Sequence, residues 1–119
     1  IFSRFSTRNA VRNAELSRKN SALQLESAKK NLYKEIQQAY YNALTSQARY
    51  SSSRESSLSA EQYYEMTEQK YLAGKAGITD YNDAKNSYLK AKSEFLQARY
   101  ECLFQTRLLD FYEGRDIVF

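Results

Sequence analysis

The sequence predicts an all-α protein built as a long antiparallel helical hairpin of the coiled-coil kind. Its 119 residues include no Pro and only three Gly, so little interrupts a helix. Ser, Ala, Tyr, Lys, Glu and Gln are common while Val and Ile are few, which favours helix over sheet. Gly74 and Gly77 lie close together, and they predict the turn that joins the two helices.

The predicted elements follow from these breakers. The first helix is expected over about residues 6–73, the tip turn over 74–79 and the second helix over about 80–113. Thr79 is expected as the N-cap of the second helix, and Gly114 as its C-terminal stop. The second helix can cover only about half of the first, so the two arms are unequal.

Small and aromatic residues recur at heptad spacing along both predicted helices. Their steps alternate between four and three residues, which is typical of a supercoiled seam. The first helix carries this seam at Ala39, Ala43, Ser46, Tyr50, Ser53, Ser57, Ala60, Tyr64, Thr67 and Tyr71. The second helix carries it at Tyr81, Ala84, Tyr88, Ala91, Phe95, Ala98, Cys102, Gln105, Leu109 and Tyr112. Because rings alternate with small residues, we expect closely spaced backbones with the rings filling the facing gaps.

Two further apolar stripes predict additional neighbours. Leu89, Leu96 and Leu103 form a second heptad stripe about 100° round the second helix, as in the wall of a curved array. Residues 5–32 have no antiparallel partner in this chain, although they carry an apolar face. That face consists of Val11, Ala14, Leu25, Ala28 and Leu32. We expect its partners elsewhere in a longer parent protein or on other copies.

The charge pattern argues against nucleic-acid binding. Eighteen basic and fourteen acidic residues give a net charge of +4, and both signs are interspersed over most of the chain. Arg4, Arg8 and Arg12 would share one helix face by their spacing. No stacking aromatic residues interleave with them, so we interpret this stripe as a solvated face.

The sequence also argues against an enzyme. There is no His, and Cys102 lies alone in the seam, so we predict no catalytic residue, metal site or cofactor. No apolar run approaches the roughly 20 residues that a membrane-spanning helix needs. The chain begins with Ile1 rather than Met, so we expect a fragment of a longer protein.

The tip and second helix resemble the second structural repeat of the TolC family of outer-membrane efflux proteins. The tip likeness is carried by Tyr71, Gly74, Ile78, Asp80, Asp83 and Ala84. It continues over residues 88–113 with Ala91, Ala98, Arg99, Tyr100 and a closing Tyr-Glu-Gly. At the start, Ile1 and Phe2 are similar to the junction of a barrel strand with a descending helix, and Ala10 and Ala14 follow in register.

This resemblance implies a part of a trimeric channel-tunnel in the cell outer membrane. Residues 1–119 would be a single periplasmic helical hairpin of its α-barrel, with the membrane strands outside this segment. The family conducts drugs, toxins or exported proteins to the exterior in tripartite efflux or type I secretion. The implied partners are a periplasmic adaptor protein and an inner-membrane pump, which open the tip by docking there. No nucleic acid and no cofactor are implied.

Asp80 and Asp83 match the family's aspartates at the channel constriction. Carboxylates three residues apart share one helix face, and a trimer would assemble them into an acidic ring that attracts cations. The alternative is that both carboxylates only complement the N-terminus of the second helix.

The remaining site residues lie on or beside the turn. Tyr71 matches a tyrosine that tethers the closed tip to neighbouring helices, or it is simply the last aromatic residue of the seam. The resemblance assigns contact with the adaptor to the exposed tip, and a plain helix–helix turn is the alternative. This tip consists of Gly74, Lys75, Ala76 and Gly77. Some family members have an arginine in place of Ala76, so no closing salt bridge is implied at that position.

Two other architectures compete with the channel. One is the coiled-coil hairpin of a periplasmic adaptor protein of the membrane-fusion type, or another structural helical module. Such hairpins have arms of matching length and a seam richer in Leu, so unequal arms and alternating small and aromatic residues favour the channel. The other is a spectrin-like three-helix bundle, which requires the first helix to bend near residues 51–53.

Overall fold

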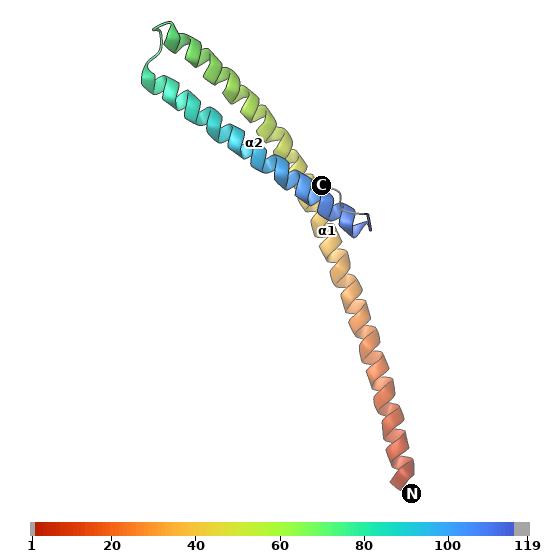
Figure 1. The fold of residues 1–119 in the computed structure, drawn as a ribbon. Coiled ribbons are helices and arrows are strands. Elements are labelled where there is room, and N and C mark those ends of the chain that lie inside the picture. Colours follow the sequence, from red (N-terminus) through yellow and green to blue (C-terminus); the bar gives the residue numbers. More distant parts are fainter. Residues whose placement is uncertain (1, 116–119) are drawn as a thin grey trace. The chain divides into compact units, whose positions relative to one another are not determined.

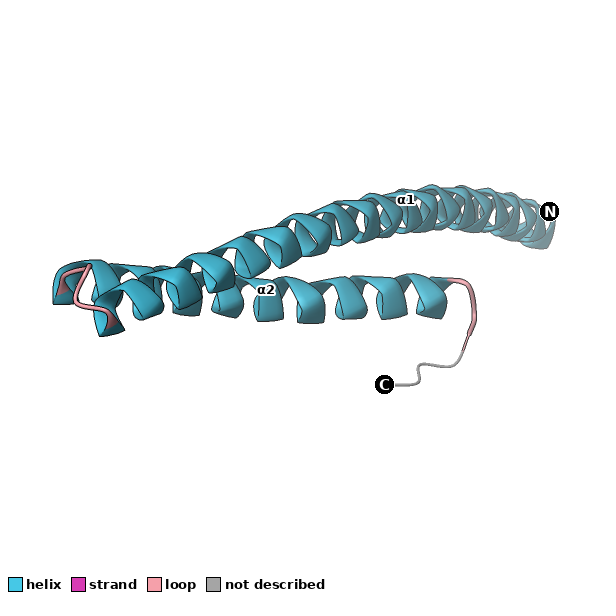
Figure 2. Cartoon of the chain, turned by 90° about the horizontal axis from the view of Figure 1, so that it is seen from above, coloured by secondary structure: helices cyan, strands magenta, loops and turns pink. Residues whose placement is uncertain are grey.

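The computed structural model describes residues 2–115, and these residues form two helices and no strand (Figures 1 and 2). Helix α1 covers Phe2–Leu72 and helix α2 covers Ile78–Tyr112. The predicted all-α helical hairpin is therefore confirmed. Helix α1 begins four residues before the expected start at about residue 6, and α2 begins two residues before the expected residue 80.

The chain divides into two units, Ile1–Gln38 and Ala39–Phe119, and α1 continues from one into the other. In the first unit, every residue from 3 to 35 is exposed. The apolar side chains of its predicted face are exposed too, with Leu25 at 58% and Leu32 at 49%. As the pattern predicted, this apolar face has no cover among the described residues.

The second unit is the hairpin, in which α2 runs antiparallel to residues 39–72 of α1 (Figure 1). Ring contacts across the two helices establish this direction. Tyr71 stacks on Tyr81 near the tip, whereas Tyr50 stacks on Phe95 further along, with ring centroids 5.6 Å apart. Residue numbers therefore fall on α1 as they rise on α2.

The buried residues of the hairpin are all small, and all lie on the predicted seams. They are Ala39, Ser46, Ser57, Thr67, Ala84, Ala91 and Ala98. The seam rings are half-buried between them, apart from the more exposed Tyr71. Because alanine has almost no side chain, the two backbones approach closely at each small residue and a ring fills the next layer.

Two buried hydroxyl groups of this seam are satisfied inside their own helix. The hydroxyl of Ser46 donates to the carbonyl of Ala43 at 2.8 Å, and that of Thr67 donates to the carbonyl of Tyr63 at 2.8 Å. A buried polar group with a hydrogen bond costs little compared with an unpaired one. The polar seam is therefore compatible with close helix packing.

A glycine with a positive φ follows the end of each helix, which is the Schellman arrangement. Gly74 has a φ of +69°, and the amide of Lys75 donates to the carbonyl of Lys70 at 2.8 Å. Gly114 has a φ of +77°, and the amide of Arg115 donates to the carbonyl of Asp110 at 3.0 Å. The predicted stop at Gly114 is confirmed.

The predicted N-cap at Thr79 is wrong, because Gly77 occupies that position. Gly77 has extended backbone angles, and its carbonyl accepts the amide of Tyr81 at 3.2 Å. Its own amide donates to Oδ2 of Asp80, three residues on, at 3.3 Å. An acidic residue at this third helical position reaches back to the capping residue, so the helix begins two residues earlier than Thr79 would allow.

Helix α1 is unbroken through residues 51–53, where the three-helix bundle would have needed a bend. No Pro or Gly lies in this stretch to cause one. The spectrin-like alternative is therefore wrong.

Candidate functional site at the hairpin tip

The four tip residues, together with Ala73, form the connection between α1 and α2. Gly74, Lys75 and Gly77 are exposed, and Ala76 is half-buried. A Cβ atom built on Gly74 would meet nothing within 4 Å, so the surface around this residue is open. The tip is thus a short, accessible connection whose path is set by the positive φ of one glycine.

Asp80 and Asp83 both lie in the first turns of α2, and both are exposed. Asp80 has a defined local role, since its carboxylate accepts the backbone amide of Gly77. Asp80 therefore stabilises the N-terminus of α2, which is the role that the alternative to a channel constriction gave it. The two residues are three positions apart, so their carboxylates lie on the same side of α2.

Tyr71 lies at the last turn of α1 and is 37% exposed. Its ring stacks on that of Tyr81, with centroids 5.0 Å apart and planes inclined by 24°. Within one chain, Tyr71 therefore acts as a seam aromatic that holds the ends of the two helices together. One part of its surface stays open to solvent beside the tip.

The stacking continues away from the tip as a ladder of four tyrosines. Tyr81 also contacts Tyr64 at 5.8 Å, and Tyr64 lies parallel to Tyr88 at 5.5 Å with an interplanar angle of 5°. The order along the ladder is thus Tyr71, Tyr81, Tyr64 and Tyr88, with successive rungs on alternate helices. Such ring contacts each add about 0.5–1.5 kcal/mol beyond area burial.

Hydroxyl groups join the ladder to a glutamate. The hydroxyl of Tyr64 donates to Oε1 of Glu68 at 3.0 Å and shares a 3.1 Å hydrogen bond with the hydroxyl of Tyr81. These contacts raise the pKa of Tyr64, with the bond to Tyr81 as the larger cause and the bond to Glu68 next. An ionised phenolate would lose the donor and face a carboxylate, so the neutral form is favoured.

A second polar group lies one turn further from the tip. The hydroxyl of Tyr88 donates to Oε1 of Glu61 on α1 at 3.0 Å, and Nζ of Lys92 donates to the same hydroxyl at 2.8 Å. Nζ of Lys92 also lies 5.1 Å from the centre of the Tyr88 ring. The hydrogen bond to Tyr88 raises the pKa of Lys92, so this amine stays charged.

Sequence reasoning placed these tyrosines on the seam but did not find their glutamate partners. Glu68 lies four residues after Tyr64 on the same helix, and that spacing could have indicated the contact. Glu61 reaches Tyr88 across the hairpin, which only the register of the two helices reveals.

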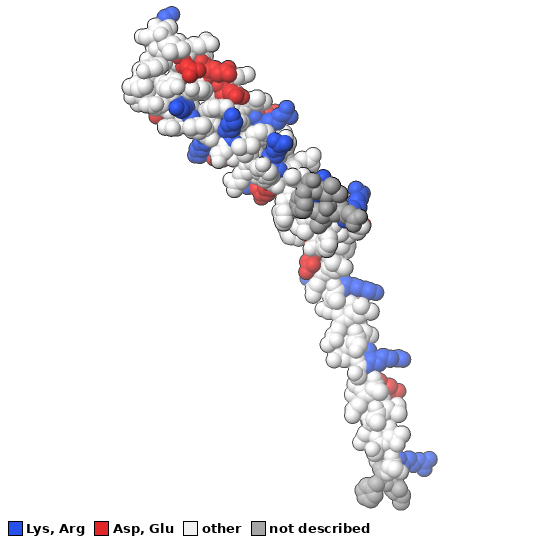
Figure 3. Space-filling model, in the orientation of Figure 1, with Lys and Arg blue, Asp and Glu red and all other residues white. Residues whose placement is uncertain are grey.

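Charge is distributed unevenly over the hairpin, and acidic side chains gather near its tip end (Figure 3). Farther from the tip, an ion pair joins the helices between Arg49 and Glu101 at 2.9 Å. Both side chains are largely exposed, so this pair contributes at most about 1 kcal/mol. Near the tip, ring contacts and hydroxyl hydrogen bonds join the two helices.

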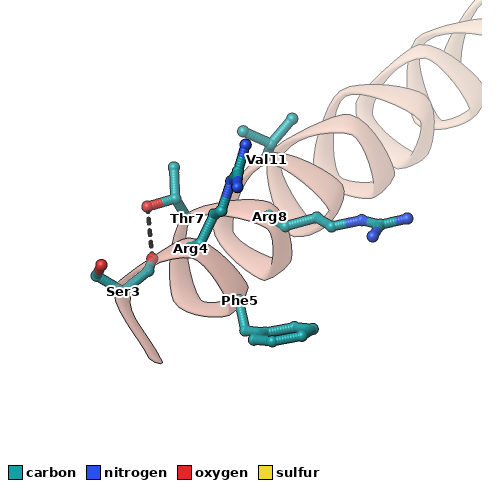
Figure 4. A pocket seen from close by; sticks show the side chains of 6 residues that line it. All are labelled: Ser3, Arg4, Phe5, Thr7, Arg8 and Val11. Carbon is teal, nitrogen blue, oxygen red and sulfur yellow. Dashed lines mark hydrogen bonds between the residues drawn. The ribbon is translucent and has the colours of Figure 1, made fainter. Parts of the chain in front are cut away.

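One hollow of the surface lies along a single helix. It is lined by Ser3, Arg4, Phe5, Thr7, Arg8 and Val11, all from the start of α1 (Figure 4). Its single hydrogen bond runs from the hydroxyl of Thr7 to the carbonyl of Ser3 at 2.9 Å. Among residues 2–115, no group of His, Cys, Asp and Glu could hold a metal ion. Neither of the two described helices is apolar enough over a sufficient length to cross a bilayer.

Comparison with known proteins assigns the family. A family model described as "Outer membrane efflux protein" matches residues 1–114, which is nearly the whole chain. No curated protein and no solved structure matches it. The matched family is one of outer-membrane transport proteins, and the long helical hairpin is consistent with it. The chain belongs to the outer membrane efflux protein family.

Proposed function

We propose that residues 1–119 are a single periplasmic hairpin of a trimeric channel-tunnel, which conducts substrates from an inner-membrane pump and its adaptor to the exterior. The family match over residues 1–114 carries this proposal. It covers both arms and the tip, so the proposal extends to the whole hairpin. The transported cargo is proposed as drugs in tripartite efflux or proteins in type I secretion.

The exposed apolar stripe of α2 supports a place in the channel wall. Leu89 is 52% exposed, Leu96 is 42% exposed and Leu103 is 43% exposed, although all three recur at heptad spacing. The seam toward α1 is already occupied by small and aromatic residues. The exposed leucines form a second apolar stripe on the same helix, and such a stripe is expected when a helix has neighbours on two sides.

The proposed constriction consists of Asp80 and Asp83. Their exposed carboxylates are free of ion pairs within the described residues, and three copies would concentrate negative charge around the entrance. A ring of carboxylates draws cations in and repels anions. The bond from Gly77 to Asp80 is compatible with this role, since it occupies one carboxylate oxygen.

The proposed contacts with other chains lie at the same end. Tyr71 would tether the closed tip to a neighbouring helix through the part of its ring that Tyr81 leaves uncovered. The exposed connection formed by Gly74, Lys75, Ala76 and Gly77 would meet the adaptor protein. Membership in the efflux protein family favours this channel over the hairpin of an adaptor.

The cargo can be tested in cells that lack the channel containing this chain. We expect deletion to increase drug susceptibility and dye accumulation if the channel serves efflux, and to retain an exported protein in the cell if it serves secretion. Restoring the intact gene should reverse the defect. A form carrying Lys75→Glu should restore it less well, because it reverses the charge of the exposed tip that is proposed to meet the adaptor. A deletion strain with neither defect would contradict the proposal.

A further inference from the structure

Over positions 3–33 the charged residues lie on one side of α1, whereas Lys34 and Glu35, which follow in the same unit, lie outside that side. At 3.6 residues per turn, those between positions 3 and 33 all fall within roughly 120° of the helix circumference. They are Arg4, Arg8, Arg12, Glu15, Arg18, Lys19, Glu26, Lys29 and Lys30. In Figure 3 several Lys and Arg side chains project from one edge of this part of the helix. The remaining two thirds of the surface carry no charge over this stretch.

Two apolar seams lie on opposite sides of the same helix. One is the face that includes Val11, Leu25 and Leu32, and the other consists of Phe5, Leu16 and Leu23. Their mean directions differ by about 180° at 100° per residue. All of these side chains are exposed in the single chain, with Phe5 at 64% and Leu16 at 61%. Figure 4 shows the arrangement at the start of the helix, where Arg8 projects between Phe5 and Val11.

A third surface lies opposite the charged side and between the two apolar seams. It carries amides and hydroxyls without a charged group, and its residues fall within roughly 60° of one another. They are Asn9, Asn13, Asn20, Gln24, Ser27 and Asn31, and all are exposed. We name this the neutral polar face.

We propose that the neutral polar face lines the water-filled conduit of the channel and forms the surface along which substrates pass. This inference rests on the proposed function. In such a wall, neighbouring helices pack against the two opposite apolar seams. Two surfaces of the helix then remain, one facing the conduit and one facing the outside of the wall. Those two surfaces are the neutral polar face and the charged side, and they differ sharply in chemistry.

The chemistry of transport favours the neutral polar face as the inward one. Basic residues outnumber acidic ones by seven to two on the charged side. Repeated in three copies, that side would hold anions and repel cations along the conduit. Amides and hydroxyls instead exchange hydrogen bonds with water and with solutes of either charge, without retaining one class. The substrate class that fits is therefore polar or amphiphilic solutes of mixed charge.

The test uses the full-length channel in planar lipid bilayers, with a salt gradient across the membrane. Asn20→Asp and Asn20→Lys should shift the reversal potential in opposite directions, toward cation and anion preference respectively. Lys19→Gln is the matched control, because it makes the same change in net charge as Asn20→Asp at the adjacent residue on the charged side. We expect it to leave the reversal potential unchanged.

A second measurement guards against variants that fail to assemble. In a Cys102→Ala background, Asn20→Cys should lose conductance when a charged, membrane-impermeant thiol reagent is added, and Lys19→Cys should not. The reverse pattern in either experiment, or no response at position 20, would overturn the inference while the channel still conducts. An unsubstituted full-length protein that forms no conducting pore would instead overturn the proposed function.

Discussion

Tyr64 and Tyr81 face each other across the hairpin with their hydroxyl oxygens 3.1 Å apart and their rings 5.8 Å apart. One residue comes from α1 and the other from α2, so this contact ties the two arms directly. The hydroxyl of Tyr64 donates its one proton to Glu68, so in the contact with Tyr81 it accepts the proton of the Tyr81 hydroxyl. The pair lies close to the tip, where the proposed entrance would have to hold its shape.

The hydroxyl of Tyr64 should make stability depend on alkaline pH. Its folded-state pKa is raised, so the folded state holds the proton more tightly than the unfolded chain does. The stabilisation is therefore complete below the unfolded pKa of about 10 and is lost as pH rises through the higher folded pKa. Thermal unfolding of the assembled channel, measured at pH 8 to 11, should show a fall in Tm above about pH 10.

Tyr64→Phe provides the comparison for that experiment. It keeps the ring contacts and removes the hydroxyl, so it should lower Tm at neutral pH and flatten the alkaline fall. Tyr100→Phe serves as a control, since Tyr100 is 69% exposed. An alkaline fall equally steep in Tyr64→Phe would show that other groups cause it.

Enlarging a buried alanine should force the arms apart. Ala84 is 0% exposed in the seam, so Ala84→Leu should destabilise the hairpin by about 1–3 kcal/mol. Lys85→Leu adds a leucine at the neighbouring, exposed position and should change stability far less. Chemical unfolding monitored by circular dichroism measures both. Equal effects of the two variants would contradict the close approach of the helices at Ala84.

The two glycines of the tip should respond differently to alanine. Gly74 has a positive φ and an open surrounding, so Gly74→Ala should cost about 1–2 kcal/mol through backbone strain alone. Gly77 has a φ of −77°, and an added Cβ atom would lie 3.7 Å from the carboxylate of Asp80. Gly77→Ala should therefore be tolerated better, with a cost below about 1 kcal/mol. Chemical unfolding of both variants measures the two costs. A larger loss of unfolding free energy in Gly77→Ala than in Gly74→Ala would refute the assignment of strain to Gly74.

Neutralising the two aspartates should separate their proposed roles in permeation and folding. Asp80→Asn keeps an oxygen that can accept the amide of Gly77, so the start of α2 should survive. The double variant with Asp83→Asn removes the acidic ring, and the cation preference of single channels should fall. Glu94→Gln, at an exposed position farther along α2, should leave that preference unchanged. Unaltered selectivity in the double variant would remove both aspartates from the constriction.

Much of the hairpin could be read from the sequence because its signals are local. Ala84, Ala91 and Ala98 recur at heptad steps, and the fixed pitch of an α-helix places residues with that spacing on one side. Gly74 and Gly114 end their helices because few other residues adopt a positive φ easily. The seams, the turn and both helix ends follow from such regularities.

Competition between neighbouring groups was harder to predict. Thr79 has a suitable side chain for an N-cap, yet Gly77 takes that position because Asp80 reaches its amide. Thr79 and Gly77 are both acceptable N-cap residues when each is considered alone. The start of α2 is decided by which of them, with the residues that follow it, provides hydrogen bonds for the free backbone amides. Propensity alone does not rank such combinations.

The sequence by itself determined the two helices, their seam and the sites where they end, since each depends on residues within a few turns of one another. Only the tertiary structure decided the partners across the hairpin, such as Glu61 for Tyr88 and Glu101 for Arg49. These residues lie on different helices, and a sliding of one helix past the other would change every pair while leaving each heptad pattern intact. The register is chosen by the combined packing of rings against small residues along both arms.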